Sequence, residues 1–166
     1  MSHLEHLIAE YLDWKGYIVK RNLKVGARAK GGWEMELDIV AYQPHTNDLI
    51  HCEPSLDAHA WEKRRSRYKK KFDAGRKRIL SEVFTWLKPE TPIRQIAIFP
   101  TATKEPFEGA TVLSVDQMTG IIRDDVMQCG VMAKKAISEF YPLLRTLQLS
   151  HCGYNKVSQA KMKLFN

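Results

Sequence analysis

Two carboxylates stand near the ends of short apolar segments that are typical of strands. Asp38 lies in the segment at residues 36–41, Glu-Leu-Asp-Ile-Val-Ala, and Glu53 lies in the segment at residues 49–55, Leu-Ile-His-Cys-Glu-Pro-Ser. Carboxylates at the ends of adjacent strands can hold a hard divalent cation, because such cations prefer oxygen ligands. The spacing therefore predicts a metal site made by two neighbouring strands.

A strongly basic segment follows these carboxylates. Residues 61–78 contain ten Lys or Arg and two acidic residues, a local balance of +8 in a chain of net charge +7. Charge concentrated in this way is typical of a surface that binds a polyanion, most often nucleic acid. A solvated helix face without a partner is the alternative, because charge runs are common on exposed helices. Beside a metal site, the segment favours metal-dependent cleavage of nucleic acid.

Composition narrows the classes of protein to which this chain can belong. The 166 residues fit a single domain, with a core at about residues 3–115 and a helical part at residues 116–166. A hydrophobic fraction of 44% argues against disorder, and the sequence has no apolar run of the roughly 20 residues that span a bilayer. We expect a cytoplasmic protein without a signal peptide, because the first residues lack basic and apolar regions and the three cysteines form no disulfide or zinc pattern.

Hydrophobic periodicity gives the order of the elements. Residues 4–14 carry a helical stripe that Ser2 and Glu5 open as a capping box. We expect a short strand at residues 17–19, a basic loop at 24–32 and strands at 35–42 and 49–52.

A long helix should follow at residues 58–87, with Gly75 as a point where it loosens or breaks. Its aromatic residues recur on one face, which favours a core role over base stacking. Strands are then expected at residues 93–99 and 110–115. A helix between two strands implies a parallel pair with a right-handed crossover. The sequence thus predicts an α/β sandwich with a mixed sheet and an α-β-β-β-α-β core.

In this order and spacing the chain resembles the PD-(D/E)xK nuclease superfamily, over roughly residues 3–100. Glu5 opens a helix that ends at Gly16-Tyr17, Asp38 sits in an apolar strand, and Glu53 sits where the family shows glutamate, any residue, lysine. The resemblance implies the three-layer α/β/α restriction-endonuclease-like fold. It also implies Mg²⁺ or Mn²⁺ bound by Asp38 and Glu53, with Glu5 as an outer or second-metal ligand.

Ser55 stands where the family usually has its lysine. Three explanations remain open: the protein cleaves with water oriented by the metal and Ser55, a lysine enters from elsewhere, or the site is silent and the domain only binds. Lys63 on the following helix is one candidate, and Lys20, Lys24 and Lys30 are others. Glu34 and Glu36 share the strand period of Asp38 and are alternative ligands.

The sequence thus predicts a Mg²⁺-dependent deoxyribonuclease, a hydrolase of phosphodiester bonds, with Glu5, Asp38, Glu53, Ser55 and Lys63 as catalytic candidates. Its partner should be nucleic acid, with DNA expected, and no membrane; a homodimer is open, because cutting a duplex often uses two active sites. A silent nuclease-like domain that binds nucleic acid or an acidic protein partner is the alternative. The basic residues expected to contact phosphates are Lys24, Arg28, Lys30, Lys63, Arg64, Arg67, Lys70 and Lys71.

Overall fold

A computed structural model describes residues 2–57, 61–101, 107 and 109–155 of the protein. The chain divides into two compact units, residues 1–119 and residues 120–166. The elements, in chain order, are α1 His3–Trp14, β1 Ile18–Ala27, β2 Trp33–Gln43, β3 Asp48–Pro54, α2 Trp61–Arg78, the π-helical turn η1 Ile79–Val83, β4 Ile93–Phe99, β5 Thr111–Ser114, α3 Val115–Met127 and α4 Pro142–Cys152.

The first unit is built on a five-stranded mixed sheet in the order β1-β2-β3-β4-β5. The first three strands are antiparallel to one another, whereas β3 and β4, and β4 and β5, run parallel. α2 and η1 connect β3 to β4, as expected of a crossover between parallel strands. The predicted α/β class, mixed sheet and α-β-β-β-α-β order are confirmed.

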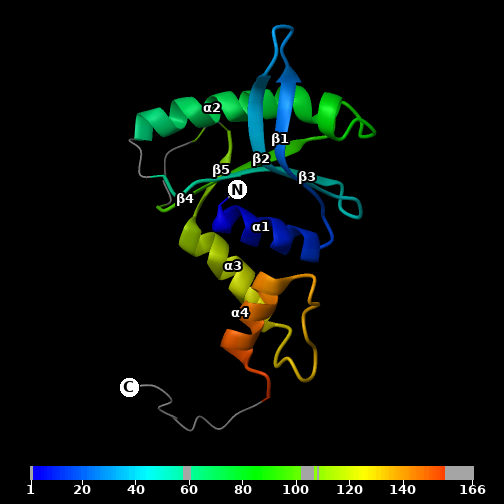
Figure 1. The fold of residues 1–166 in the computed structure, drawn as a ribbon, viewed down its shortest axis with the longest axis vertical. Helices are drawn as coiled ribbons and strands as arrows, with labels where there is room; N and C mark the ends of the chain where they lie inside the picture. Colours follow the sequence, from blue (N-terminus) through cyan, green and yellow to red (C-terminus); the bar gives the residue numbers. More distant parts are fainter. Residues whose placement is uncertain (1, 58–60, 102–106, 108, 156–166) are drawn as a thin grey trace. The chain divides into compact units, whose positions relative to one another are not determined.

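Helices cover both faces of this sheet: Figure 1 shows α2 on one side of the central strands and α1 on the other. The predicted capping box begins α1, since the Ser2 hydroxyl accepts a hydrogen bond from the Glu5 amide at 3.2 Å. Its buried stripe includes Leu4, Ile8 and Leu12. α2 packs on its side through Tyr68 and Phe72, which belong to an apolar cluster with residues of β4.

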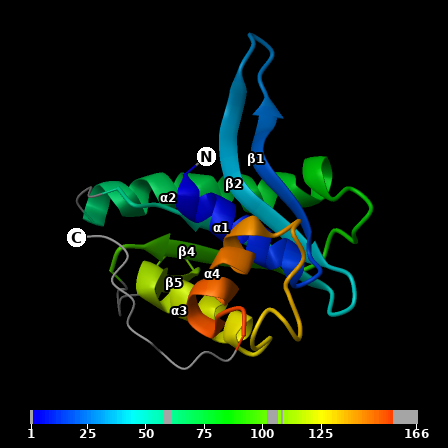
Figure 2. The same ribbon diagram turned by 60° about the horizontal axis from the view of Figure 1, so that its bottom comes forward.

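The β1–β2 hairpin is longer than the sequence indicates. β1 pairs with β2 as far as Ala27 opposite Trp33, so the prediction of a short strand followed by a basic loop at residues 24–32 is wrong for its first part. Cross-strand pairing and burial of Val25 keep this segment extended despite its charge. The turn is confined to residues 28–32, and Figures 1 and 2 both show the hairpin reaching past α2.

The long helix also differs from its prediction. The described part of α2 begins at Trp61, while residues 58–60 of the predicted helix lie outside the described residues. Gly75 does not break it, because the helix continues to Arg78 before the π-helical turn. The core role expected for its aromatic face is confirmed at Tyr68 and Phe72 but not at Trp86, which lies beyond the helix and is 61% exposed.

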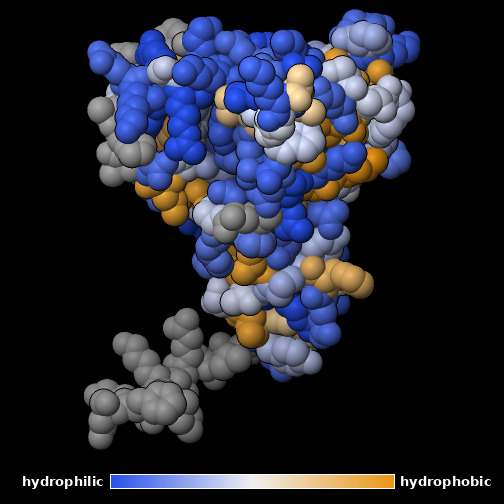
Figure 3. All heavy atoms as spheres, turned by 45° about the horizontal axis from the view of Figure 1, so that its top comes forward, coloured by the Kyte–Doolittle hydropathy of each residue, from blue (hydrophilic) through white to orange (hydrophobic). Residues whose placement is uncertain are grey.

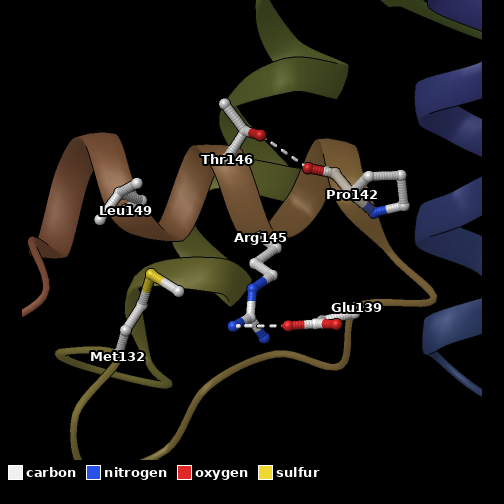
Figure 4. Close-up of a pocket in the computed structure, with 6 residues that line it drawn as sticks. All are labelled: Met132, Glu139, Pro142, Arg145, Thr146 and Leu149. Carbon is white, nitrogen blue, oxygen red and sulfur yellow. Dashed lines mark hydrogen bonds and ion pairs between the residues drawn. The ribbon is translucent and has the colours of Figure 1, made fainter.

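The second unit contains most of α3, all of α4 and the segment between them. Gln148 is fully buried there: its amide donates to the carbonyls of Gly130 and Lys135, and its carbonyl accepts from the Ile137 amide. A shallow pocket beside α4 is crossed by an ion pair of 3.4 Å between Arg145 and Glu139 (Figure 4).

Candidate active site

Asp38 and Glu53 come together because of the antiparallel register of β2 and β3. Ile39 pairs with Cys52, so the preceding residue of β2 stands opposite the following residue of β3. The backbone amide of Asp38 donates a hydrogen bond of 3.1 Å to Oε1 of Glu53. The two carboxylates predicted to form a site therefore do lie side by side.

Lys71, on the inward face of α2, supplies a cation to both carboxylates. Its ammonium is 2.7 Å from Oδ1 of Asp38 and also contacts Oε2 of Glu53. The side chains of Glu53 and Lys71 are 0% and 8% exposed, whereas that of Asp38 is 19% exposed. Solvent and ligands can thus reach this cluster through Asp38.

His51 completes the cluster from the buried side. It lies two residues before Glu53 on β3, and its Nε2 is 2.7 Å from Oε1 of Glu53. Gln95 of β4 approaches Nδ1 of the same ring at 3.3 Å, and the edge of Phe72 packs against the imidazole. Burial and the nearby Lys71 ammonium lower the His51 pKa to about 3, so this imidazole is neutral at physiological pH.

The electrostatics of the cluster disfavour two bare carboxylates. Burial, followed by the hydrogen bond and charge of Glu53, raises the pKa of Asp38 to about 7, although Lys71 opposes this shift. Burial by itself lowers the pKa of Lys71, but the charges of Glu53 and Asp38 outweigh it and leave that pKa raised. The site therefore holds a lysine ammonium at neutral pH, beside a carboxyl group that gains or loses a proton near that pH.

Lys71 of α2 is the lysine that joins the two carboxylates, in place of the lysines that the sequence suggests for the site. Lys63 is exposed on the first turn of α2, about 12 Å along the helix from Lys71. Lys20 bonds the Val83 carbonyl, and Lys24 and Lys30 are exposed on the hairpin. Lys71 had been grouped with the surface residues that contact phosphates, and its burial corrects that assignment.

The other predicted site residues are bonded to groups outside the cluster or are exposed. The Glu5 carboxylate accepts a hydrogen bond from Ser2 in the cap of α1, the helix on the other side of the sheet from α2 (Figure 1). The Ser55 hydroxyl accepts from the Asp57 amide at 3.1 Å. Glu34 pairs with Arg78 at 2.6 Å, and Glu36 is exposed. Among the described residues, no hydrogen bond or ion pair therefore joins any of these four side chains to the carboxylates of Asp38 and Glu53.

His51 and Gln95 are the site residues that sequence reasoning missed. The sequence did carry a signal for His51: it precedes Glu53 by two residues in a strand, so both side chains must point to the same face of the sheet. Gln95 had no such signal, because only the parallel register of β3 and β4 sets it beside His51.

The arrangement fits Mg²⁺ or Mn²⁺ chemically, with Asp38 and Glu53 as the protein ligands. Across the described ranges no group of three or more His, Cys, Asp and Glu side chains lies together as a metal site would require. Mg²⁺ needs fewer protein ligands, since it commonly binds one or two carboxylates and completes its shell with water and substrate phosphates. Lys71 already shows that the space between the two carboxylates accepts a cation.

The other basic residues of α2 and of the β1–β2 hairpin include two exposed groups. Lys63, Lys69, Lys70 and Lys77 are exposed on α2, and Arg28 and Lys30 are exposed at the tip of the hairpin. Arg64 and Arg67 are tied to Asp57, and Arg64 also lies over the ring of Phe99. Figure 3 shows mainly hydrophilic residues over the face that α2 and the hairpin present.

None of the described helices is long and apolar enough to cross a membrane. No family model matches the chain, and no curated protein matches it. Among solved structures the chain is similar to the crystal structure of a protein of unknown function, AF1548, at 13% sequence identity and a TM-score of 0.49. That match covers 87% of this chain and 77% of the other.

Proposed function

We propose that this protein is a metal-dependent nuclease of the PD-(D/E)xK type, which hydrolyses phosphodiester bonds of DNA with a lysine supplied by α2. The observation that carries the proposal is the contact of the Lys71 ammonium with both Asp38 and Glu53. An aspartate and a glutamate on adjacent strands, joined by a lysine, make the set of side chains that this chemistry requires. The lysine comes from a different element than in the usual motif.

In this proposal Asp38 and Glu53 hold the cation, which would lower the pKa of a bound water and offset charge on the phosphate. Lys71 has to leave its position between them, and its four-carbon side chain allows this movement. The pKa of Lys71 is raised by the two carboxylates in the metal-free site, and a lysine away from them is still an ammonium at neutral pH. It therefore acts by donating hydrogen bonds to the attacking water or to the scissile phosphate, and orients them.

The exposed basic residues would bind the substrate backbone. Lysines on the outer face of α2 and the basic tip of the hairpin carry positive charge that matches phosphates. Trp33, at the first position of β2, is 48% exposed and offers a ring on which a base can stack. Trp33 precedes Asp38 by five residues on β2, so the tip lies roughly 17 Å along the strand from the site.

A domain that binds nucleic acid without cleaving it is the second candidate. One observation favours it: Lys71 already pairs with both carboxylates, so the cluster is an ion-pair network that forms without a metal. An ion-pair network of this kind can be retained because it specifies the fold, without any catalytic role. The two candidates differ in whether Asp38 and Glu53 exchange Lys71 for a divalent cation.

The test combines cleavage and metal binding. Wild type, Asp38→Ala and Lys71→Met would be incubated with Mn²⁺ or Mg²⁺ and labelled single-stranded, duplex and branched DNA, with Lys70→Met as the matched control. We expect cleavage by wild type and Lys70→Met that is lost in the other two variants and in EDTA. If the protein binds DNA but neither cleaves it nor binds Mn²⁺, the nuclease proposal is rejected in favour of the binding domain.

A further inference from the structure

The hydrogen bonds around Glu53 assign different tasks to its two oxygens. Oε1 accepts two hydrogen bonds, one from the Asp38 amide at 3.1 Å and one from Nε2 of His51 at 2.7 Å. Oε2 faces the Lys71 ammonium. A carboxylate oxygen with two donors in place has little capacity for a further ligand, so Oε2 alone is left for an exchangeable cation.

Donor and acceptor rules fix the protonation of His51 through Gln95. The Gln95 amide nitrogen is 2.9 Å from the carbonyl of Phe72, which only accepts, and the Gln95 oxygen contacts Arg76, which only donates. The amide therefore has a single orientation, and its nitrogen is what lies 3.3 Å from Nδ1 of His51. Nδ1 must accept, so the ring proton is on Nε2 and points at Glu53.

Gly75 makes room for this ring. A Cβ atom at position 75 would lie 2.3 Å from Nδ1 and 2.5 Å from Cε1 of His51, closer than such atoms ever approach. α2 thus has a residue of low helix propensity at the position where the imidazole ring packs against the helix backbone. The predicted weak point of α2 is a contact site for His51.

We infer that His51 is a positioning residue whose Nε2 proton holds Oε1 of Glu53, so that Glu53 binds a cation through Oε2 alone. Gln95 sets the tautomer, and Gly75 gives the ring its place. The cation part of this inference rests on the proposed function, whereas the hydrogen-bond part does not. A side chain that orients a metal ligand in this way typically changes metal affinity 10–100-fold when it is removed.

The first test is independent of metal and of activity. Long-range ¹H–¹⁵N spectra of metal-free protein would report the protonation of each His51 nitrogen, with the signals assigned by their loss in His51→Gln. We expect protonated Nε2 and bare Nδ1 in wild type and in the control Gln43→Glu. In Gln95→Glu, which replaces the donor by an acceptor, Nδ1 should gain the proton. A proton on Nδ1 in wild type would overturn the inference.

The second test measures Mn²⁺ binding by calorimetry. We expect His51→Leu to bind 10–100-fold more weakly than wild type and His51→Gln, whose amide can still donate to Glu53, to recover most of the loss. Equal affinity of His51→Leu and wild type would overturn the positioning role. If wild type binds no Mn²⁺, the proposed function and the cation part of the inference both fail, while the tautomer still decides the hydrogen-bond part.

Discussion

The two faces of α2 put the same residue type to opposite uses. Lys70 and Lys71 are neighbours in a run of three lysines, yet Lys70 is exposed and Lys71 is buried between two carboxylates. The inward face also carries Phe72 and Gly75, which contact His51. The outward face carries lysines that remain in solvent.

This difference shows that, within a run of charged residues, the direction in which each side chain points from the helix determines what it contacts. Local composition does not. Each residue rotates by about 100° around the helix, so adjacent lysines point in directions that the sheet treats differently. The side toward β2 and β3 meets carboxylates that need a cation. The side toward solvent keeps its lysines exposed, and under the proposed function these lysines bind a polyanion.

The largest effect on the cleavage rate is expected from a substitution on the inward face of α2, at Lys71. Lys71→Met should lower the rate of phosphodiester cleavage by 10²–10⁴-fold, because an orienting or proton-handling group typically contributes that much. Lys70→Met should leave the rate at saturating DNA unchanged and weaken only binding. Single-turnover cleavage assays measure this contrast, and similar rate losses in the two variants would contradict the division between the faces.

Metal-free Lys71→Met should still fold, because Asp38, whose pKa is already raised to about 7, can bind a proton. This leaves one negative charge, on Glu53, which keeps its hydrogen bonds to the Asp38 amide and His51. Thermal unfolding at pH 6 would check that the loss of cleavage is not a loss of structure.

The second effect concerns pH and the inward face. The pKa of Asp38 is about 7 in the folded protein and about 3.9 in an unfolded chain, so the folded state binds more protons between these values. Asp38 therefore lowers stability as pH rises from about 4 to 7. The gain in stability from Asp38→Asn should be larger at pH 8 than at pH 4.5, by on the order of 2–3 kcal/mol.

His51 acts in the opposite direction, since its pKa is about 3 when folded and about 6.5 when unfolded. Its contribution is lost as pH falls below about 6.5, so Asp38→Asn, which keeps His51, should lose stability on acidification more steeply than wild type. Asp73 is the outward control: Arg76 lowers its pKa, so Asp73→Asn should show no pH-dependent difference from wild type between pH 4.5 and 8. Urea unfolding in EDTA measures all three proteins.

A third contrast compares two helical glycines. Gly75→Ala should destabilise the protein by about 1–3 kcal/mol, because the new Cβ would collide with the His51 ring. Gly120→Ala in α3 meets no atom within 4 Å and should stabilise by about 0.5–1 kcal/mol, the helix propensity difference. Thermal unfolding of both variants tests this, and a stabilising Gly75→Ala would place His51 elsewhere.

The smallest expected effects lie on the outward face. Lys63→Ala and Lys70→Ala should each weaken binding to all DNA sequences alike and reduce the slope of log affinity against log salt by about 1. Lys20→Ala is a suitable comparison, because Lys20 is bonded to the Val83 carbonyl and should leave the slope unchanged. Fluorescence anisotropy between 50 and 200 mM salt, roughly the range in which phosphate contacts are lost, measures these slopes.

Much of the site was predictable because it depends on local patterns. Glu53 stands near the end of β3, and Asp38 stands in the middle of β2, next to the last residue that pairs with β3. Two antiparallel strands joined by a short turn must bring residues at such matching positions close. The crossover helix and the parallel strand after it also followed from the order of apolar segments. For Glu5 the spacing resembles that of the family, and the structure adds that its carboxylate accepts a hydrogen bond from Ser2 in the cap of α1.

By itself, the sequence determined the α/β class, the mixed sheet, the pair of carboxylates and the concentration of positive charge after them. Tertiary structure alone decided which lysine joins those carboxylates, that Gln95 sets the state of His51, and that Gly75 receives the ring. The physical reason is that periodicity fixes which face of its element a side chain occupies. What that face meets depends on the register between strands and on the rotation of α2 about its axis relative to the sheet. Both are determined by contacts between residues that lie far apart in the sequence.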